Sequence, residues 1–251
     1  MTKVVLLLCW LSWGVQALAA GAQQKLESKA VTVLCYHTFL GKTSIFTDFS
    51  LAEFSEQIKQ LVGAGYRFVS LAQVENGEIS GQKNLLVMFD DGHHTAATAF
   101  NQVMAPQGLP AVFALFPAGI ASPHYMNWEQ VKALAEVPGN AIVVHGYHHE
   151  KLFDRFARSN PQQFMDEFEK AKNILEKKLN QTFHTFVYPY GVISASGKEQ
   201  LKKSGYLYAY GLAQRPLLIP LSTNPDPLAL PRYMLTRPLV KQVLAKLLRV
   251  P

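Results

Sequence analysis

Two adjacent carboxylates stand directly after an apolar run in the first half of the chain. The run covers residues 84–89, and Asp90, Asp91 and Gly92 follow it. Polar residues just past the C-terminal end of a buried strand are where α/β folds place their chemistry. Two neighbouring carboxylates repel each other, and the repulsion is relieved if one binds a cation and the other stays free as a base. A plain Asp-Gly turn is the alternative that this stretch alone leaves open.

A histidine-rich segment supplies two imidazoles at positions i and i+4, His145 and His149. On a helical turn this spacing puts both rings on one face, about 6 Å apart at a rise of about 1.5 Å per residue. Two imidazoles and one carboxylate make the ligand set that leaves a coordination position open for water on zinc. A bound cation lowers the pKa of that water and polarises a carbonyl, so the set predicts hydrolysis of an ester or amide. A histidine-rich surface turn is the alternative.

A hydrolase of this kind also needs a base for the water, a donor to the oxyanion and an acid for the leaving group. One member of the Asp pair can be the base. Tyr190 lies in a Pro-Tyr-Gly turn whose backbone N–H could face an oxyanion. His37 follows an apolar segment, and a histidine suits the acid because its pKa is near neutrality. A plain strand exit at Tyr190 and a buried structural His37 are the alternatives.

Alternating strands and helices are expected to position these side chains. Apolar runs predict strands at 31–35, 66–71, 84–89, 109–116, 141–144 and 183–187, and one near Tyr206. Helical spacing and capping residues predict helices at 51–62, 95–104, 128–137, 160–179, 197–204 and 238–248, with mostly loop at 214–231. The alternation favours an α/β fold with a parallel sheet or a (β/α) barrel, in which the polar residues at strand ends converge on one face.

Length and composition favour one globular domain with a large core. The formal charge is +6, but the basic residues are spread along the chain without interleaved aromatics, so no nucleic-acid partner is expected. Residues 1–20 have the pattern of a secretory signal peptide, with cleavage near Ala19 or Ala20. A retained membrane anchor is the alternative, although the run is short for a span. A linker at 21–29 and a catalytic domain at 30–251 follow.

Cleavage of the signal leaves Cys35 as the one cysteine of the mature chain, so no internal disulfide is expected. We expect an exported monomer in the periplasm, the cell envelope or the extracellular space. After signal cleavage the chain is not expected to insert stably into a membrane.

Three motifs in this order resemble the polysaccharide deacetylase family with the NodB homology domain (carbohydrate esterase family 4): Phe89-Asp90-Asp91-Gly92, His145-x-x-x-His149 and Tyr188-Pro189-Tyr190-Gly191. The similarity runs from about residue 31 to residue 234. The resemblance implies a single-domain, distorted (β/α) barrel. It also implies Asp90 as the catalytic base, the Tyr190 N–H in the oxyanion hole, and one divalent metal ion held by Asp91, His145 and His149.

The implied reaction removes acetyl groups from the N-acetylglucosamine units of an acetylated polysaccharide, with peptidoglycan and poly-β-1,6-N-acetylglucosamine both open. Zinc is the expected metal, although two imidazoles and a carboxylate also admit cobalt or nickel. An acetyl-xylan-type O-deacetylase with the same site is one alternative. A catalytically inactive glycan-binding module that kept the fold is another.

The chain departs from the family at several positions. Gly146 stands where many members carry Ser or Thr, and Val187 stands where an arginine often orients the base. No histidine follows His184, so the late motif that usually supplies the acid is absent. The Tyr36-His37 pair matches a subgroup resembling the poly-β-1,6-N-acetylglucosamine deacetylases, which takes its acid from an N-terminal strand. This match makes His37 the expected acid.

Two further roles are hypotheses. Arg232 could supply the missing guanidinium to Asp90. Tyr36, Tyr147 and Trp128 are candidates for stacking on sugar rings, with core packing as the alternative for Trp128.

Overall fold

The computed structural model describes residues 29–249. The signal peptide expected at 1–20 and the linker at 21–29, apart from its last residue, lie outside the described residues, so both stay predictions. Among the helices that the structure describes, none is long and apolar enough to cross a membrane.

A nine-stranded sheet forms the centre of the described chain, in the order β7-β6-β5-β4-β3-β1-β8. β2 pairs with the start of β3, and β9 pairs with the end of β1. The pairings are parallel except for β1 with β8, which is antiparallel. The strands are β1 (Lys29–Tyr36), β2 (Arg67–Phe68), β3 (Asn84–Phe89), β4 (Val112–Leu115), β5 (Ala141–Val144), β6 (Thr185–Val187), β7 (Tyr208–Tyr210), β8 (Leu217–Ile219) and β9 (Tyr233–Met234).

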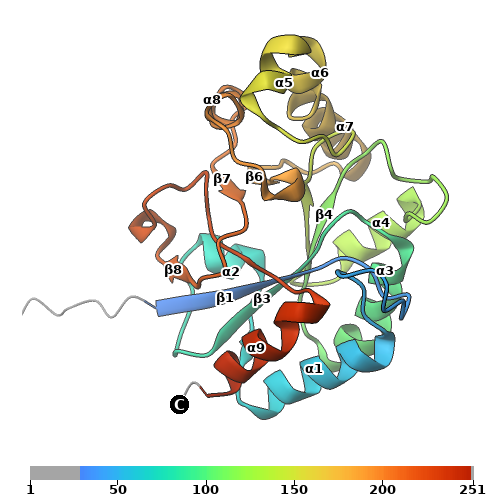
Figure 1. Cartoon of the computed structure of the whole chain (residues 1–251), viewed down its shortest axis with the longest axis vertical. Coiled ribbons are helices and arrows are strands. Elements are labelled where there is room, and N and C mark those ends of the chain that lie inside the picture. Colours follow the sequence, from blue (N-terminus) through green and yellow to red (C-terminus); the bar gives the residue numbers. More distant parts are fainter. Residues whose placement is uncertain (1–28, 250–251) are drawn as a thin grey trace, which may run out of the picture.

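Helices surround this sheet and make the distorted (β/α) barrel that the sequence predicts. Figure 1 shows α1 beside α9 at one end of the molecule, and α5, α6, α7 and α8 gathered at the other. Two predicted helix starts are confirmed, because Ser50 and Asn127 each complete a capping box. The helices are α1 (Leu51–Gly63), α2 (Leu71–Glu75), α3 (His94–Ala99), α4 (Trp128–Glu136), α5 (Asp154–Ser159), α6 (Pro161–Asp166), α7 (Glu169–Leu179), α8 (Ala195–Lys203) and α9 (Arg237–Leu248).

β3 is enclosed along its whole length, since all of its residues are buried. Its parallel register with β1 places Phe89 opposite Tyr36, and its register with β4 places Phe89 opposite Phe113. The backbone continues this alignment past the strands, because Asp90 N–H donates to Tyr36 O at 2.8 Å. In the same way, His145 N–H donates to the carbonyl of Leu115 at 2.9 Å. The polar residues that follow these strands therefore meet at one edge of the sheet.

Three predicted segments differ from the structure, the first two in their extent and the third, expected to be mostly loop, by one short strand. The strand expected at 66–71 keeps only Arg67–Phe68, because Ser70 forms a capping box with Gln73 and starts α2. The helix expected at 160–179 breaks into α6 and α7 at Glu167 and Phe168. The loop expected at 214–231 contains β8, which pairs with β1.

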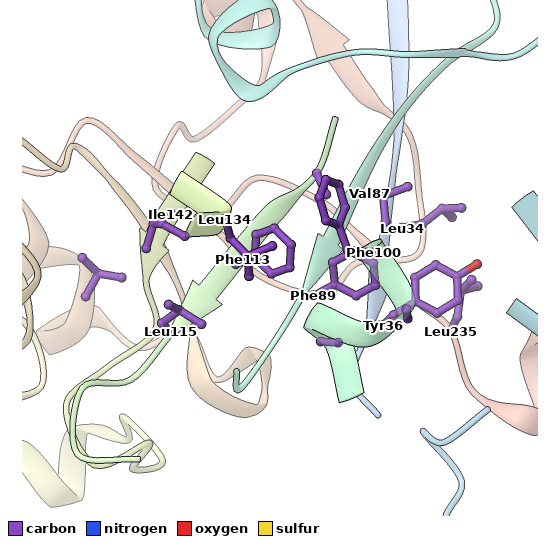
Figure 2. Packing of buried hydrophobic residues seen from close by; sticks show 14 of the residues in the cluster. Leu34, Tyr36, Val87, Phe89, Phe100, Phe113, Leu115, Leu134, Ile142 and Leu235 are labelled. Atoms are coloured by element: carbon purple, nitrogen blue, oxygen red, sulfur yellow. The ribbon is translucent and has the colours of Figure 1, made fainter. Parts of the chain in front are cut away.

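Tyr36 belongs to the hydrophobic core, so its proposed role in stacking on sugar rings is wrong. Its side chain is fully buried, and its ring lies edge-on to Phe54 with centroids 5.0 Å apart. Figure 2 shows Tyr36 among the packed side chains of Phe89, Phe100 and Leu34. The Tyr36 hydroxyl donates to Gln57 Oε1 at 2.9 Å, which satisfies its one polar atom inside the core.

A Tyr36→Phe variant is expected to unfold with a free energy lower by about 1 kcal/mol, because Gln57 Oε1 loses its donor inside the core. Urea denaturation measures this change. Its apparent affinity for glycan oligosaccharides should match that of the unchanged protein. Unchanged stability with weakened glycan affinity would contradict the core assignment.

Candidate active site

A buried ion pair fixes the first carboxylate of the pair that follows β3. Arg232, just before β9, donates from Nη1 to Asp90 Oδ1 at 2.8 Å and from Nη2 to Oδ2 at 3.0 Å. Arg232 Nε donates to Gly211 O at 3.2 Å, which anchors the guanidinium from behind. The two side chains are almost fully buried. The structure thus brings together the two groups that the Arg232 hypothesis requires to meet.

The ion pair decides the charge of Asp90. Burial alone would raise the pKa of this carboxyl, but Arg232, with His145 and His37, outweighs burial and holds the pKa at about 2. Cys35 Sγ lies 3.2 Å from Asp90 Oδ2 and donates to it. Burial raises the pKa of the Cys35 thiol, and the Asp90 carboxylate raises it further, so the thiol keeps its proton. Asp90 is therefore an ionised, firmly oriented acceptor through the neutral pH range.

The second carboxylate faces the two histidines of the following loop. Asp91 Oδ1 lies 3.3 Å from His145 Nε2 and 3.1 Å from His149 Nε2. His145 Nδ1 lies 2.8 Å from Val187 O and donates to it, which leaves a lone pair on Nε2. Asp91 Oδ1 is buried with no hydrogen bond of good geometry in the described structure. Lone pairs that converge in this way need a cation between them.

This donor set fits a divalent metal ion. One ligand atom from each of Asp91, His145 and His149 lies within 4.8 Å of the other two, and two imidazole nitrogens with a carboxylate oxygen suit zinc. Burial would raise the pKa of Asp91, but the two histidines hold it well below its usual range. Burial would lower the pKa of His145, and the two aspartates outweigh it and raise the pKa. The first shift keeps the Asp91 carboxylate negatively charged, and the second favours a positive charge beside it.

The expected helical turn from His145 to His149 is wrong, because residues 145–150 form an irregular loop. His149 has a left-handed backbone with a φ of 66°, and Gly146 has a φ of 81°. The loop nevertheless brings the two rings together, with centroids 4.8 Å apart. A buried carboxylate replaces the helical hydrogen bonds. Glu167, between α6 and α7, accepts the backbone N–H groups of Tyr147, His148 and Glu150 at 3.0, 2.9 and 3.2 Å.

The same contact explains the glycine at position 146. A Cβ on Gly146 would lie 2.5 Å from Glu167 Oε2, and the left-handed backbone disfavours any other residue. Glu167 is 1 % exposed, so its carboxylate has little room to withdraw. In this chain the Glu167 carboxylate therefore occupies the space that a Ser or Thr side chain would need.

A Glu167→Gln variant is expected to unfold with a free energy lower by about 3 kcal/mol, because one of the two oxygens that accept the three backbone N–H groups becomes an NH₂ group that cannot accept. The freed loop should also bind zinc more weakly. Thermal unfolding and calorimetric zinc titration measure the two effects. The control is Glu169→Gln, two positions away and exposed, which should change neither quantity. If Glu167→Gln and Glu169→Gln had the same unfolding free energy and the same zinc affinity, Glu167 would not be the residue that positions the loop.

His37 lies on the other side of Asp90, directly after β1. One atom each from Cys35, His37 and Asp90 lies within 4.8 Å of the other two. Burial lowers the pKa of His37, against the opposite pull of Asp91 and Asp90. Its Nδ1 is buried and has no hydrogen-bond partner among residues 29–249. A buried imidazole with a free ring nitrogen is well suited to pass a proton to a group in the cavity.

These residues line a cavity of about 360 Å³, whose wall also includes Tyr190 and Leu212. A cleft of about 970 Å³ adjoins it, since His149 and Tyr190 line both spaces. Tyr190 has a left-handed backbone with a φ of 56°, and its ring lies 4.5 Å from that of His149 between centroids. The Pro-Tyr-Gly turn thus stands at the junction of cavity and cleft.

Two of the proposed sugar-stacking residues do not reach these spaces. In the described structure neither Trp128 nor Tyr147 lines the cavity or the cleft. Both rings pack against the hydrophobic core and carry a lysine on the other face, Lys178 over Trp128 and Lys170 over Tyr147. Core packing therefore accounts for these two aromatics, and their assignment to sugar stacking stays a prediction.

Other aromatic side chains line the cleft instead: Phe116, Tyr125, Phe153 and Phe156. The sequence analysis missed them, together with Cys35 and Glu167. One signal was available for Glu167, because it stands three residues after Phe164 and just before Phe168, on the apolar face of the predicted helix. A charged residue at such a position is buried only with partners.

The chain is similar to proteins of known family. YxkH of Bacillus subtilis (strain 168), which carries a provisional polysaccharide deacetylase name, is 25% identical over 179 residues. The match covers 69% of this chain and 61% of that protein, so the chain spans less than two thirds of this relative.

Two solved structures share the fold. The structure of IcaB from Ammonifex degensii gives a TM-score of 0.74 at 22% identity and covers 88% of this chain and 97% of that one. The deacetylase PplD of Streptococcus pyogenes in complex with acetate gives 0.72 at 18% identity and covers 89% and 100%. The family model named polysaccharide deacetylase matches residues 78–209, more than half of the chain. On this match, the chain belongs to the polysaccharide deacetylase family.

Proposed function

We propose that this protein is an exported, divalent-metal-dependent hydrolase that removes N-acetyl groups from N-acetylglucosamine units of a polysaccharide. The observation that carries the proposal is the unequal state of the two aspartates. Asp90 is held ionised against Arg232, while Asp91 faces His145 and His149 with an unsatisfied oxygen. One carboxylate is thereby kept as a free base beside a site fit for a cation.

Each residue has a distinct role in the proposed hydrolysis. A divalent ion held by Asp91, His145 and His149 supplies Lewis acidity for the acetyl carbonyl and its attacking water. Asp90 accepts the proton of that water, and Arg232 keeps the carboxylate ionised and turned toward the cavity. The backbone N–H of Tyr190 donates to the oxyanion. His37 donates a proton to the amine nitrogen as the bond to the acetyl carbon breaks.

A His37→Ala variant is expected to release acetate about 10²-fold more slowly, because the amine leaves without a proton donor. Its zinc content should stay unchanged, since His37 is outside the Asp91–His145–His149 group. The rate is measured on an N-acetylated glycan and on an activated aryl acetate, whose leaving group needs no acid. If the rate of acetate release fell by the same factor on both substrates, His37 would not be the acid.

The size and the lining of the cleft beside the cavity support a polymeric substrate. The cavity opens to a cleft of about 970 Å³ lined by aromatic and basic side chains, among them Lys151 and Arg155. Such a cleft has room for sugar units on either side of the one that reacts. We propose peptidoglycan or poly-β-1,6-N-acetylglucosamine as the polymer, zinc as the metal, and a monomer in the periplasm or cell envelope as the working form.

Acetate release from a panel of purified polymers tests the proposal. The panel contains peptidoglycan, poly-β-1,6-N-acetylglucosamine, chitooligosaccharides and acetyl xylan, each with and without chelator. We expect release from at least one N-acetylated polymer, loss with chelator and recovery with zinc. Activity on acetyl xylan alone would replace the proposal by an O-deacetylase, and no release from any polymer would reject the enzyme assignment.

A further inference from the structure

Three histidines outside the active site bring their rings together at the start of α3. One ring nitrogen from each of His93, His94 and His124 lies within 4.8 Å of the other two. The His93 and His94 rings stack with centroids 4.6 Å apart, and the His93 and His124 rings lie parallel at 6.2 Å. An all-imidazole donor set of this kind suits zinc, nickel or copper.

The His93 ring is fixed by hydrogen bonds at the start of α3. Its Nδ1 accepts the backbone N–H of Thr95 at 3.2 Å and lies 2.8 Å from Thr95 Oγ1, and that oxygen also accepts the N–H of Phe39 at 3.0 Å. An ion on Nε2 requires the tautomer that carries its proton on Nδ1, and Thr95 Oγ1 is the acceptor within reach of that proton. Because Nδ1 is occupied, Nε2 is the nitrogen left for a ligand.

The other two histidines can complete the site by side-chain rotation. His94 and His124 are exposed, so their rings are free to change rotamer. Nitrogens bound to one zinc ion lie about 3.4 Å apart, as follows from Zn–N bonds of about 2.1 Å in tetrahedral geometry. The ring nitrogens, which now lie within 4.8 Å of one another, therefore need to close by at most about 1.4 Å.

The backbone that carries His124 is fixed against the start of α3. His124 has a φ of 76°, a left-handed conformation that is uncommon outside glycine. Its carbonyl accepts His94 N–H at 2.9 Å, and Met126 N–H donates to Gly92 O at 3.0 Å. Backbone of this type persists where the surroundings determine it, and such residues cluster at ligand sites.

We propose that His93, His94 and His124 bind a second divalent transition-metal ion, of the zinc, nickel or copper class. The ion joins the loop 117–126 to the first turn of α3. Tyr125 of this loop lines the cleft beside the active site, so the ion holds one wall of the cleft in place. The site does not depend on the proposed reaction, because it needs neither Asp90 nor an acetylated ligand.

Metal counting in variants that isolate each site tests the proposal. Asp91→Asn/His149→Asn removes ligands of the first site, and His94→Gln/His124→Gln removes ligands of the second. Protein without a histidine tag is stripped with chelator, titrated with Zn²⁺ and measured by calorimetry and native mass spectrometry. We expect two ions in the unchanged protein, one in each double variant and none in the combined variant. His184→Gln, an exposed histidine outside both groups, should keep two.

Hydrogen exchange of residues 117–126 tests whether the second ion holds the loop. In the Asp91→Asn/His149→Asn protein, Zn²⁺ is expected to slow exchange in this loop by at least about tenfold. The combined variant should show no such change. A single ion in the unchanged protein, or two ions retained without His94 and His124, would overturn the proposal. A second ion in a protein that releases no acetate would reject the proposed reaction and leave this site standing.

Discussion

An Asp90→Asn variant is expected to release acetate about 10²–10⁴-fold more slowly while it still binds the divalent ion of the active site. The amide cannot take up the proton of the attacking water, and general-base catalysis is worth this factor. Asp90 is not in the Asp91–His145–His149 group, so zinc content should be unchanged. Acetate release at saturating substrate and metal content by mass spectrometry measure the two quantities.

The same change has a second consequence that needs its own control. Arg232 is 1 % exposed, and Asp90→Asn leaves its charge buried without a counterion. Breaking a buried pair in this way costs about 3–5 kcal/mol of unfolding free energy, whereas replacing both charges by neutral groups is often nearly neutral. Asp90→Asn/Arg232→Met should therefore recover stability without activity. If this double variant released acetate at the rate of the unchanged protein, Asp90 would not be the catalytic base.

Loss of the active-site metal is expected to abolish measurable turnover. Asp91→Asn and His149→Asn each remove one ligand, and Asn is chosen because it tolerates the left-handed backbone at both positions. Lewis-acid stabilisation is worth several kcal/mol, which corresponds to at least about 10³ in rate. Each variant should bind zinc at the active site much more weakly, and excess zinc should restore part of the activity.

Chelation of the unchanged protein should reproduce this loss and lower its melting temperature. A ligand present at about 100 times its dissociation constant stabilises the folded state by about 2.7 kcal/mol. His148→Gln is the matched control, because this exposed side chain lies in the same loop and outside the ligand group. Full acetate release from metal-free protein, or a loss in His148→Gln as large as in His149→Asn, would contradict the assignment.

Local sequence patterns were enough to predict most of the strands and most of the longer helices. The apolar run 84–89 is β3 without any change of bounds, and the polar residues after it stand where the prediction puts them. Parallel strands bring their C-terminal ends to one edge, so a strand prediction is also a prediction of which residues can meet. His37, Asp90, Asp91 and His145 follow from this rule.

The face to which each strand residue points could not be predicted for β1. An apolar strand buried on both faces has no alternation of polar and apolar residues to set its phase. Tyr36 therefore appeared open to the substrate although it points into the core, and its neighbour Cys35 went unnoticed although it points to Asp90. Successive side chains of a strand point to opposite faces of the sheet, so a shift of one residue moves a side chain from one face to the other.

The sequence by itself determined the family motifs, the α/β alternation and the set of polar residues at the strand ends, because these depend on local periodicity and on parallel strand order, and the distorted barrel followed from the family resemblance. Only the tertiary structure decided how the two adjacent carboxylates differ. Asp90 meets an arginine 142 positions away, and Asp91 meets a loop shaped by the distant Glu167. Contacts over such separations depend on how complete elements pack, and no local pattern encodes them.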